Sequence, residues 1–258
     1  MEETNRYYLG VDIGSTYTKL VVVGGNDEPV FREVMPTLSR RKRRFEETVE
    51  QARDLFSIEG VCATGYGRHR FECELRRPEL VCASVGVSVT HKTRKCIIDI
   101  GGEDLKVIES GADGSVLGFS MNDKCSAGTG TFITEIAEKA ELEIAEMSNL
   151  ARSSITDRTI NSFCTVFART EILEWKFSGV PLEDIARGIY LSLVNRIRRM
   201  SVPAGVPVIL CGGVIAHHPY LGELMGGAMD APIEVAHEPQ LCVALGAAVI
   251  ARQIGSRS

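Results

Sequence analysis

The sequence lacks several features that define common functional classes. No stretch of 18 residues is both apolar and free of charge, so no membrane-spanning helix is expected. The first residues include Glu2, Glu3 and Arg6 in place of the apolar core of a secretion signal. The formal net charge is −5, which argues against non-specific binding to nucleic acid. We therefore expect a cytoplasmic protein with neither a membrane nor a nucleic acid as partner.

Familiar nucleotide and metal motifs are also missing. No G-x-x-x-x-G-K-[ST] segment is present, which excludes a P-loop, and Gly128-x-Gly130 lacks the third glycine of a Rossmann fingerprint. No C-x-x-C is present, so the usual zinc signature is absent. Eight cysteines in a cytosolic chain then indicate thiols or metal ligands and not a disulfide framework.

The chain instead contains two similar segments, each an apolar run that ends in Asp-x-Gly. The first run ends at Asp12 and Gly14, and the second ends at Asp99 and Gly101. Each is followed by further apolar runs with strand periodicity, and each half then continues with helical patterns. The repeat predicts an α/β protein with two related subdomains, residues 1–94 and 95–240, and a C-terminal helix, 241–258, that returns toward the first subdomain.

Helices are expected over 40–56, 78–89, 163–177 and 182–200, and a last one after Gln240. The 44% hydrophobic composition is enough for a full core in each half. A pair of histidines, His217 and His218, follows the double glycine Gly212-Gly213 and is expected to lie in an exposed loop.

Turns of this kind suit phosphate chemistry. Glycines and hydroxyl groups let backbone N–H groups approach phosphate oxygens, and an aspartate can hold a hydrated Mg²⁺. Two such turns facing one another across a cleft could grip a triphosphate, with Asp12 and Asp99 sharing one Mg²⁺ through its waters. The candidate phosphate-binding residues are Gly14, Ser15, Thr16, Lys19, Gly101 and Gly102. A single D-x-G-S-T segment is explained equally well by a plain hairpin turn.

Two cysteines stand at the starts of expected helices. Cys125 precedes the glycine-rich helix start Gly128-Thr129-Gly130, and Cys164 precedes another apolar helical run. The positive end of a helix favours a thiolate, which is the form that binds metal. The alternative is two buried thiols with no ligand. The other six cysteines are expected to pack as small apolar residues.

Five segments in order resemble the ATPase fold shared by sugar kinases, Hsp70 and actin, which is built from ribonuclease H-like subdomains around a nucleotide cleft. They are Asp12-x-Gly-Ser-Thr, Asp99-x-Gly-Gly, Gly128-Thr-Gly, Gly212-Gly-Val214 and Ala244-x-Gly-Ala-Ala. More narrowly, Gly65-Tyr-Gly-Arg68, the segment 122–130, Cys164–Ala168 and Pro239-Gln240 resemble the ATP-dependent activators of 2-hydroxyacyl-CoA dehydratases, a family that includes the ATPase subunits of benzoyl-CoA reductase.

The resemblance implies an ATPase coupled to electron transfer. The expected cofactors are ATP or ADP, Mg²⁺ and one 4Fe-4S cluster per homodimer, held by Cys125 and Cys164 of each subunit. Gly212, Gly213, Val214 and Gln240 would complete the nucleotide site. The expected partners are an acyl-CoA dehydratase or reductase and an electron donor such as ferredoxin or flavodoxin. The alternatives are a small-molecule kinase of the same fold with no cluster, or a regulatory ATPase whose thiols sense redox state.

Two positions depart from the family pattern. Glu103 stands where the family normally has Gln, so it could act as a general base, together with Asp12 and Asp99 as catalytic residues. A carboxylate near a γ-phosphate is repulsive unless Mg²⁺ or Lys106 compensates for its charge. Ala83 stands where the family commonly has His, which leaves the substrate of the partner enzyme open.

Overall fold

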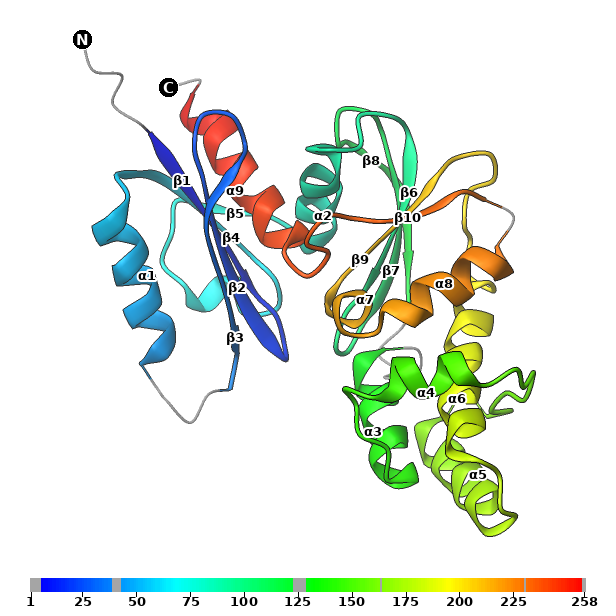
Figure 1. Ribbon diagram of the computed structural model, residues 1–258. Helices are drawn as coiled ribbons and strands as arrows, with labels where there is room; N and C mark the ends of the chain where they lie inside the picture. Colours follow the sequence, from blue (N-terminus) through cyan, green and yellow to red (C-terminus); the bar gives the residue numbers. More distant parts are fainter. Residues whose placement is uncertain (1–5, 39–42, 123–128, 163, 230, 257–258) are drawn as a thin grey trace. The chain divides into compact units, whose positions relative to one another are not determined.

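The computed structural model describes residues 6–38, 43–122, 129–162, 164–229 and 231–256, and the chain divides into two compact units (Figure 1). Unit 1 comprises Met1–Lys95, Ser110–Gly118 and Leu241–Ser258. Unit 2 comprises Cys96–Glu109 and Phe119–Gln240. The described residues form two five-stranded sheets with flanking helices, which confirms the predicted α/β class.

The first sheet has the strand order β3-β2-β1-β4-β5. Its strands are β1 (Tyr7–Ile13), β2 (Tyr17–Val23), β3 (Pro29–Pro36), β4 (Ile58–Thr64) and β5 (Leu75–Arg76). The central strand β1 pairs antiparallel with β2 and parallel with β4. Asp12 is opposite Lys19 on β2 and opposite Thr64 on β4, so the Asp-x-Gly turn begins between these two neighbours.

Helices cover both faces of this sheet. The helices of unit 1 are α1 (Arg44–Leu55), α2 (Glu79–Ser88), α9 (Cys242–Gly255) and the short 3₁₀ helix η1 (Arg68–Arg70). Val49 and Ala52 of α1 join the core that Leu9 and Val11 form on one face. On the other face, a Cβ at Gly10 would lie 2.0 Å from the Ala244 carbonyl oxygen, so α9 packs directly on the backbone of β1.

The second sheet has the order β10-β9-β6-β7-β8. Its strands are β6 (Lys95–Ile100), β7 (Leu105–Ser110), β8 (Val116–Met121), β9 (Val208–Cys211) and β10 (Ile233–Val235). The central strand β6 is fully buried and pairs parallel with β9, which places Asp99 opposite Cys211. Asp99 therefore ends a central strand beside a parallel neighbour, as Asp12 does in unit 1.

Unit 2 carries helices beside its sheet, α7 and α8, and a group of helices beyond the sheet, α3 to α6 (Figure 1). They are α3 (Gly130–Ala140), α4 (Met147–Ser153), α5 (Thr165–Phe177), α6 (Leu182–Ile197), α7 (Gly213–His217) and α8 (Pro219–Ala228). One apolar core runs from β6 and β7 through these helices. The helices expected over 163–177 and 182–200 are confirmed, whereas α4 and α8 were not predicted. Their short or glycine-rich sequences have weak helical preference, and tertiary packing overrides it.

None of the described helices is long and apolar enough to cross a lipid bilayer.

Candidate functional site

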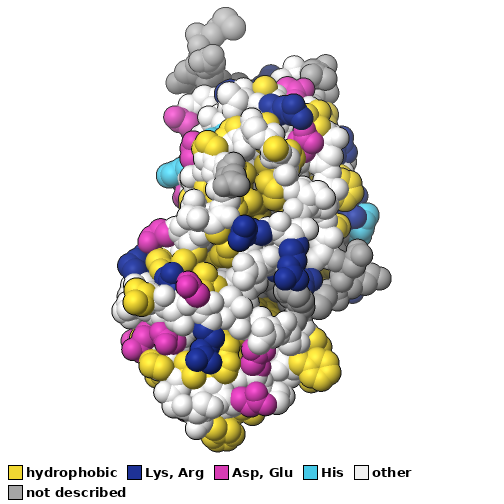
Figure 2. Space-filling view, turned by 90° about the vertical axis from the view of Figure 1, so that its right-hand side faces the viewer, with side chains coloured by type: hydrophobic (Ala, Val, Ile, Leu, Met, Phe, Trp, Pro, Cys, Tyr) yellow, Lys and Arg dark blue, Asp and Glu magenta, His cyan; other side chains and the backbone are white. Residues whose placement is uncertain are grey.

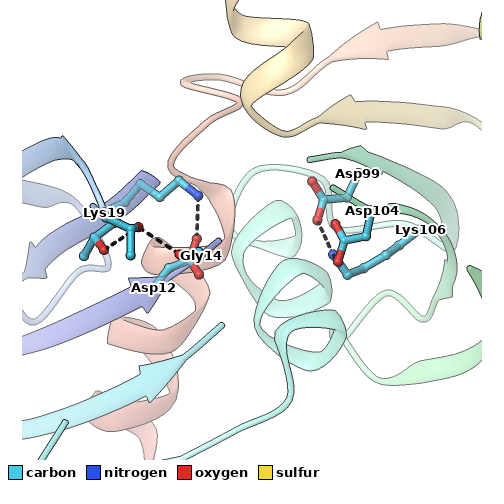
Figure 3. Close-up of polar contacts among 8 residues, drawn as sticks. Asp12, Gly14, Lys19, Asp99, Asp104 and Lys106 are labelled. Carbon is cyan, nitrogen blue, oxygen red and sulfur yellow. Dashed lines mark hydrogen bonds and ion pairs between the residues drawn. The ribbon is translucent and has the colours of Figure 1, made fainter. Parts of the chain in front are cut away.

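The turn between β1 and β2 presents a buried carboxylate paired with a lysine (Figure 3). Asp12 is 1% exposed, and its Oδ2 accepts a hydrogen bond from Lys19 Nζ at 2.9 Å. The antiparallel register places these two residues opposite one another, and the ion pair offsets the cost of burying the carboxylate. Ser15 is half-buried and Thr16 is exposed in the same turn.

The second oxygen of Asp12 is suited to a metal-bound water. Asp12 Oδ1 is buried and has no hydrogen-bond partner among the described residues. A Cβ at Gly65 would lie only 2.6 Å from this oxygen, and the φ of Gly65 is +85°, so a glycine is required there. An ionised oxygen without a donor is costly when buried, and a water held by Mg²⁺ would supply the donor. The residues present therefore fit a hydrated magnesium ion.

A threonine beyond β3 holds the first turn in place. Thr37 Oγ1 donates a hydrogen bond to the Gly14 carbonyl oxygen at 2.8 Å and lies 3.0 Å from Thr18 Oγ1. The Thr37 N–H donates to the Thr16 carbonyl oxygen at 2.9 Å. These contacts tie both sides of the turn to one residue, which limits the conformations that the turn can adopt.

The turn between β6 and β7 is built in a similar way. Asp99 is 3% exposed, and Lys106 Nζ lies 3.6 Å from its Oδ2 (Figure 3). Lys106 also pairs with Asp104, whose Oδ2 lies 2.7 Å from the ammonium. Glu103 is exposed in this turn. Three carboxylates therefore share one short segment with a single lysine.

Gly212, which follows β9, and Gly130, the first residue of α3, pack against Asp99 and the turn that follows it. Gly212 has a φ of +97°, and a Cβ there would lie 2.5 Å from Asp99 Oδ1, as a Cβ at Gly65 would meet Asp12. The Gly130 N–H donates to the Gly101 carbonyl oxygen at 3.0 Å, so the start of α3 is bonded to the turn itself. Thr129 is buried beside it.

The closing segment of unit 2 lies beside the double glycine. The Gly212 N–H donates to the Pro239 carbonyl oxygen at 2.8 Å, and Gln240 Nε2 lies 3.7 Å from the position of a Cβ on Gly213. Val214 is buried and its side chain meets Gly130. The structure thus brings together, within unit 2, the candidate residues around Asp99 that lie in the described part of the chain.

Cys164 is exposed at the residue before α5. Val166 and Phe167, in the first turn of that helix, are each 67% exposed. Figure 2 shows protruding hydrophobic side chains among charged ones at its lower end, which is the part of unit 2 formed by α3 to α6. Arg169 of α5 and Glu135 of α3 form an ion pair at 2.9 Å, so α5 packs beside the helix that follows Cys125 in the sequence. Cys125 and Gly128 lie outside the described residues.

The other cysteines behave as the sequence predicts for small apolar residues. Five of them, Cys62, Cys82, Cys96, Cys211 and Cys242, are buried, and Cys73 is half-buried. Burial raises the pKa of the Cys96 thiol to about 12, so it stays neutral.

The expectation of an exposed histidine pair is wrong for His218. His217 is exposed, but His218 is 5% exposed and Tyr190 Oη lies 2.7 Å from its Nδ1. The unpredicted helix α8 begins at the next residue and folds His218 back onto α6, which a loop assignment could not foresee.

Sequence reasoning assigned no site role to three residues that contact the two turns. They are Thr37, Asp104 and Gly65, and of these only Gly65 appeared in a motif, Gly65-Tyr-Gly-Arg68. The sequence does contain a signal for the second turn, because a lysine follows Asp12 and Asp99 by the same number of residues. In each unit this lysine pairs with the aspartate. For Thr37 no local pattern points to Gly14, which is distant in the sequence.

Two sheet units with matching Asp-x-Gly turns define an actin-like α/β ATPase. The chain belongs to the BadF/BadG/BcrA/BcrD ATPase family, which it matches over residues 9–251. It is 34% identical over 254 residues to a 2-hydroxyisocaproyl-CoA dehydratase activator of Clostridioides difficile, an alignment that covers 95% of this chain and 94% of the relative.

Two solved structures share the fold over nearly the whole chain. One is component A of the (R)-2-hydroxyglutaryl-CoA dehydratase of Acidaminococcus fermentans, with a TM-score of 0.89, 29% identity and coverage of 97% of this chain and 99% of the other. The other is the Clostridium difficile activator of 2-hydroxyisocaproyl-CoA dehydratase with bound ADPNP, with a TM-score of 0.86, 33% identity and coverage of 97% and 96%. These likenesses confirm the actin-like fold and the family that the sequence motifs indicate.

Proposed function

We propose that this protein is an ATP-hydrolysing activator that delivers a single low-potential electron to an acyl-CoA dehydratase or reductase. Its membership of this ATPase family and its similarity to dehydratase activators support the ATPase part and the kind of partner. The observation that carries the electron-transfer part is Cys164, an exposed thiol at the start of a 13-residue helix. The protein would act in the cytoplasm and take its electron from a donor such as ferredoxin or flavodoxin.

In this proposal the nucleotide is bound by both turns. Gly14, Ser15, Thr16 and Lys19 of unit 1 contact phosphate oxygens, and Asp12 and Asp99 hold a hydrated Mg²⁺. Unit 2 contributes the glycine-rich set Gly101, Gly102, Gly128, Thr129, Gly130, Gly212, Gly213, Val214 and Gln240. Glu103, exposed in its turn, accepts a proton from the attacking water. Asp12 Oδ1, buried without a described donor, supports the metal assignment.

Cys164 would hold a 4Fe-4S cluster together with Cys125 and the same two residues of a second subunit. A cubane needs four thiolates, and twofold symmetry turns two cysteines into four. When bound, such a cluster supplies one-electron chemistry. The chain contributes the thiolates and the positive end of α5, which favours the negative charge on sulfur. The exposed Val166 and Phe167 beside Cys164 are apolar surface that a second subunit would cover.

Anaerobic purification followed by iron and sulfide analysis tests the proposal. We expect a brown dimer that hydrolyses ATP. The Cys164→Ala variant should lose its iron while still binding nucleotide, and Asp12→Ala or Asp99→Ala should lose ATP hydrolysis while retaining iron. A Cys164→Ala protein with its full complement of iron would refute the ligand assignment. A colourless wild-type protein that phosphorylates a sugar would instead support a kinase.

A further inference from the structure

Unit 2 has a lysine at the place in its turn that Lys19 occupies in unit 1. Lys19 follows Asp12 by seven residues, and Lys106 follows Asp99 by seven. Both ammonium groups lie beside the aspartate, at 2.9 Å in unit 1 and 3.6 Å in unit 2. The two lysines are therefore structural counterparts, although only the turn of Lys19 contains hydroxyl residues beside its glycine.

The backbone of the two turns follows the same path. The Gly14 N–H donates to the Tyr17 carbonyl oxygen at 3.1 Å, and the Gly101 N–H donates to the Asp104 carbonyl oxygen at 2.9 Å. Each glycine stands two residues after its aspartate, and each bond closes the turn onto the third residue beyond the glycine. The side chains next to these glycines can therefore be compared directly.

A carboxylate takes in unit 2 the place that the ammonium takes in unit 1. Lys19 Nζ is the nearest side-chain atom to a Cβ placed on Gly14, at 3.4 Å. At Gly101 the nearest atom is Asp104 Oδ1, at 2.7 Å. The other oxygen of Asp104 pairs with Lys106 at 2.7 Å. Asp104 thus lies against both the turn glycine and the lysine ammonium.

The charges around this turn make the arrangement unfavourable for a bound phosphate. Residues 99–106 contain three carboxylates, on Asp99, Glu103 and Asp104, and one ammonium, on Lys106. Like charges a few ångströms apart repel, so an incoming phosphate must replace a carboxylate or be neutralised. The Lys106 side chain is 5% exposed and needs an anion, whereas Asp104 is 36% exposed and can turn into water.

We propose that Lys106 is a phosphate-binding residue of unit 2 and that the Asp104 carboxylate occupies the position of the phosphate when no nucleotide is bound. The Asp104 carboxylate pairs with Lys106 until a phosphate oxygen of a bound nucleotide takes over the ammonium. This inference rests on the proposed nucleotide binding and adds two residues to it. It requires that the two side chains, although they touch one another, have opposite effects on affinity for phosphate.

The test is calorimetric titration of the full-length protein with AMP, ADP and a non-hydrolysable ATP analogue, with and without Mg²⁺. For Lys106→Met we expect the analogue to bind about ten- to hundredfold more weakly, with a smaller loss for ADP and little for AMP, because a charge-assisted bond to phosphate is lost. For Asp104→Asn we expect the analogue to bind about three- to tenfold more tightly, because one repelling charge is removed.

Two control variants separate this role from a structural one. Lys95→Met removes a buried lysine of unit 1 that donates to the carbonyl oxygens of Thr93 and Gly111. This variant should be less stable, but its affinity for nucleotides should depend on the number of phosphates as in the wild type. Asp113→Asn removes an exposed turn carboxylate and should change no affinity.

Three outcomes would overturn the inference. An equal loss of affinity for all three nucleotides in Lys106→Met would show that Lys106 only supports the fold. Weaker binding of the analogue by Asp104→Asn, with and without Mg²⁺, would show that Asp104 stabilises the complex. Weaker binding only in the presence of Mg²⁺ would show that Asp104 holds the metal. By contrast, a wild-type protein that binds none of the three nucleotides would refute the proposed function itself.

Discussion

At the scale of single residues, the chain balances each of several buried charges with a specific partner. Asp12 pairs with Lys19, and Lys106 lies between two carboxylates. Lys95, which is fully buried, donates hydrogen bonds to two carbonyl oxygens, and burial lowers the pKa of its ammonium. Removing one member of such a pair leaves the other charge buried and uncompensated, which costs several kcal/mol.

His218 is a buried group that remains neutral. Burial lowers the pKa of its imidazole to about 4 and raises the pKa of Tyr190 to about 12. The tyrosine hydroxyl therefore keeps its proton, and the hydroxyl and Nδ1 form a hydrogen bond across 2.7 Å. This bond links α6 to the junction of α7 and α8, and the short helix α7 joins that junction to the double glycine of the candidate site.

The pKa of His218 predicts a loss of stability in mild acid. The unfolded chain binds a proton at His218 below its ordinary pKa of about 6.5, whereas the folded chain does so only near 4. Stability from this group is therefore complete above about pH 7 and falls as the pH drops from 6.5 to 4, by up to about 3 kcal/mol. Urea denaturation at pH 7 and pH 4.5 measures this change.

The control for this prediction is His218→Asn, whose side chain does not titrate. We expect this variant to be less stable than the wild type at pH 7 and to lose less stability on acidification. If both proteins lost the same free energy of unfolding between the two pH values, groups other than His218 would account for the acid sensitivity.

At the scale of helices and strands, glycines set how closely α2 and α9 approach. A Cβ at Gly246 of α9 would lie 1.8 Å from the Cys82 carbonyl oxygen, and a Cβ at Gly86 of α2 would lie 1.9 Å from that of Cys242. In both cases the obstacle is backbone, which cannot move aside as a flexible side chain can. The two helices therefore pack through reciprocal glycine contacts.

Gly246→Ala should consequently destabilise unit 1. The methyl group forces α2 and α9 apart, and overpacking of this kind costs about 1–3 kcal/mol or more. Thermal and urea denaturation measure the loss. Gly226→Ala is a matched control, because no atom lies within 4 Å of a Cβ at this position in α8. It should stabilise the protein by up to about 1 kcal/mol, since alanine is the better helix former. Equal effects of the two changes would contradict the packing account.

At the scale of the whole molecule, the proposed dimer depends on the apolar surface at the start of α5. Phe167→Glu places a charge on that surface, so we expect a monomer that fails to retain iron although both proposed cysteine ligands are present. Sedimentation velocity and iron analysis under anaerobic conditions measure both effects.

Phe177→Glu is the matched control for Phe167→Glu. It changes the same residue type at the other end of the same helix, where the side chain is 88% exposed. This variant should remain a dimer and keep its iron. Loss of the dimer in both variants, or in neither, would show that the interface does not lie at the start of α5.

Much of the fold could be predicted because it follows from local pattern and repetition. The runs that end at Asp12 and Asp99 are central strands, and the helix expected over 182–200 is α6. The helix α8 was not expected, because Gly222, Gly226 and Gly227 weaken its helical signal and only contacts with the core stabilise it. His218 was misplaced for the same reason.

The sequence alone determined the family, the α/β class and the residues that end the two central strands, because glycine turns, hydrophobic periodicity and cysteine motifs are local properties of the chain. Only the tertiary structure decided which groups meet those residues. Gly65 against Asp12, Gly212 against Asp99 and Thr37 on the first turn are contacts between segments distant in the chain. Such contacts arise when strands distant in the chain align in a sheet and side chains compete for the same buried space, and no local pattern records that competition.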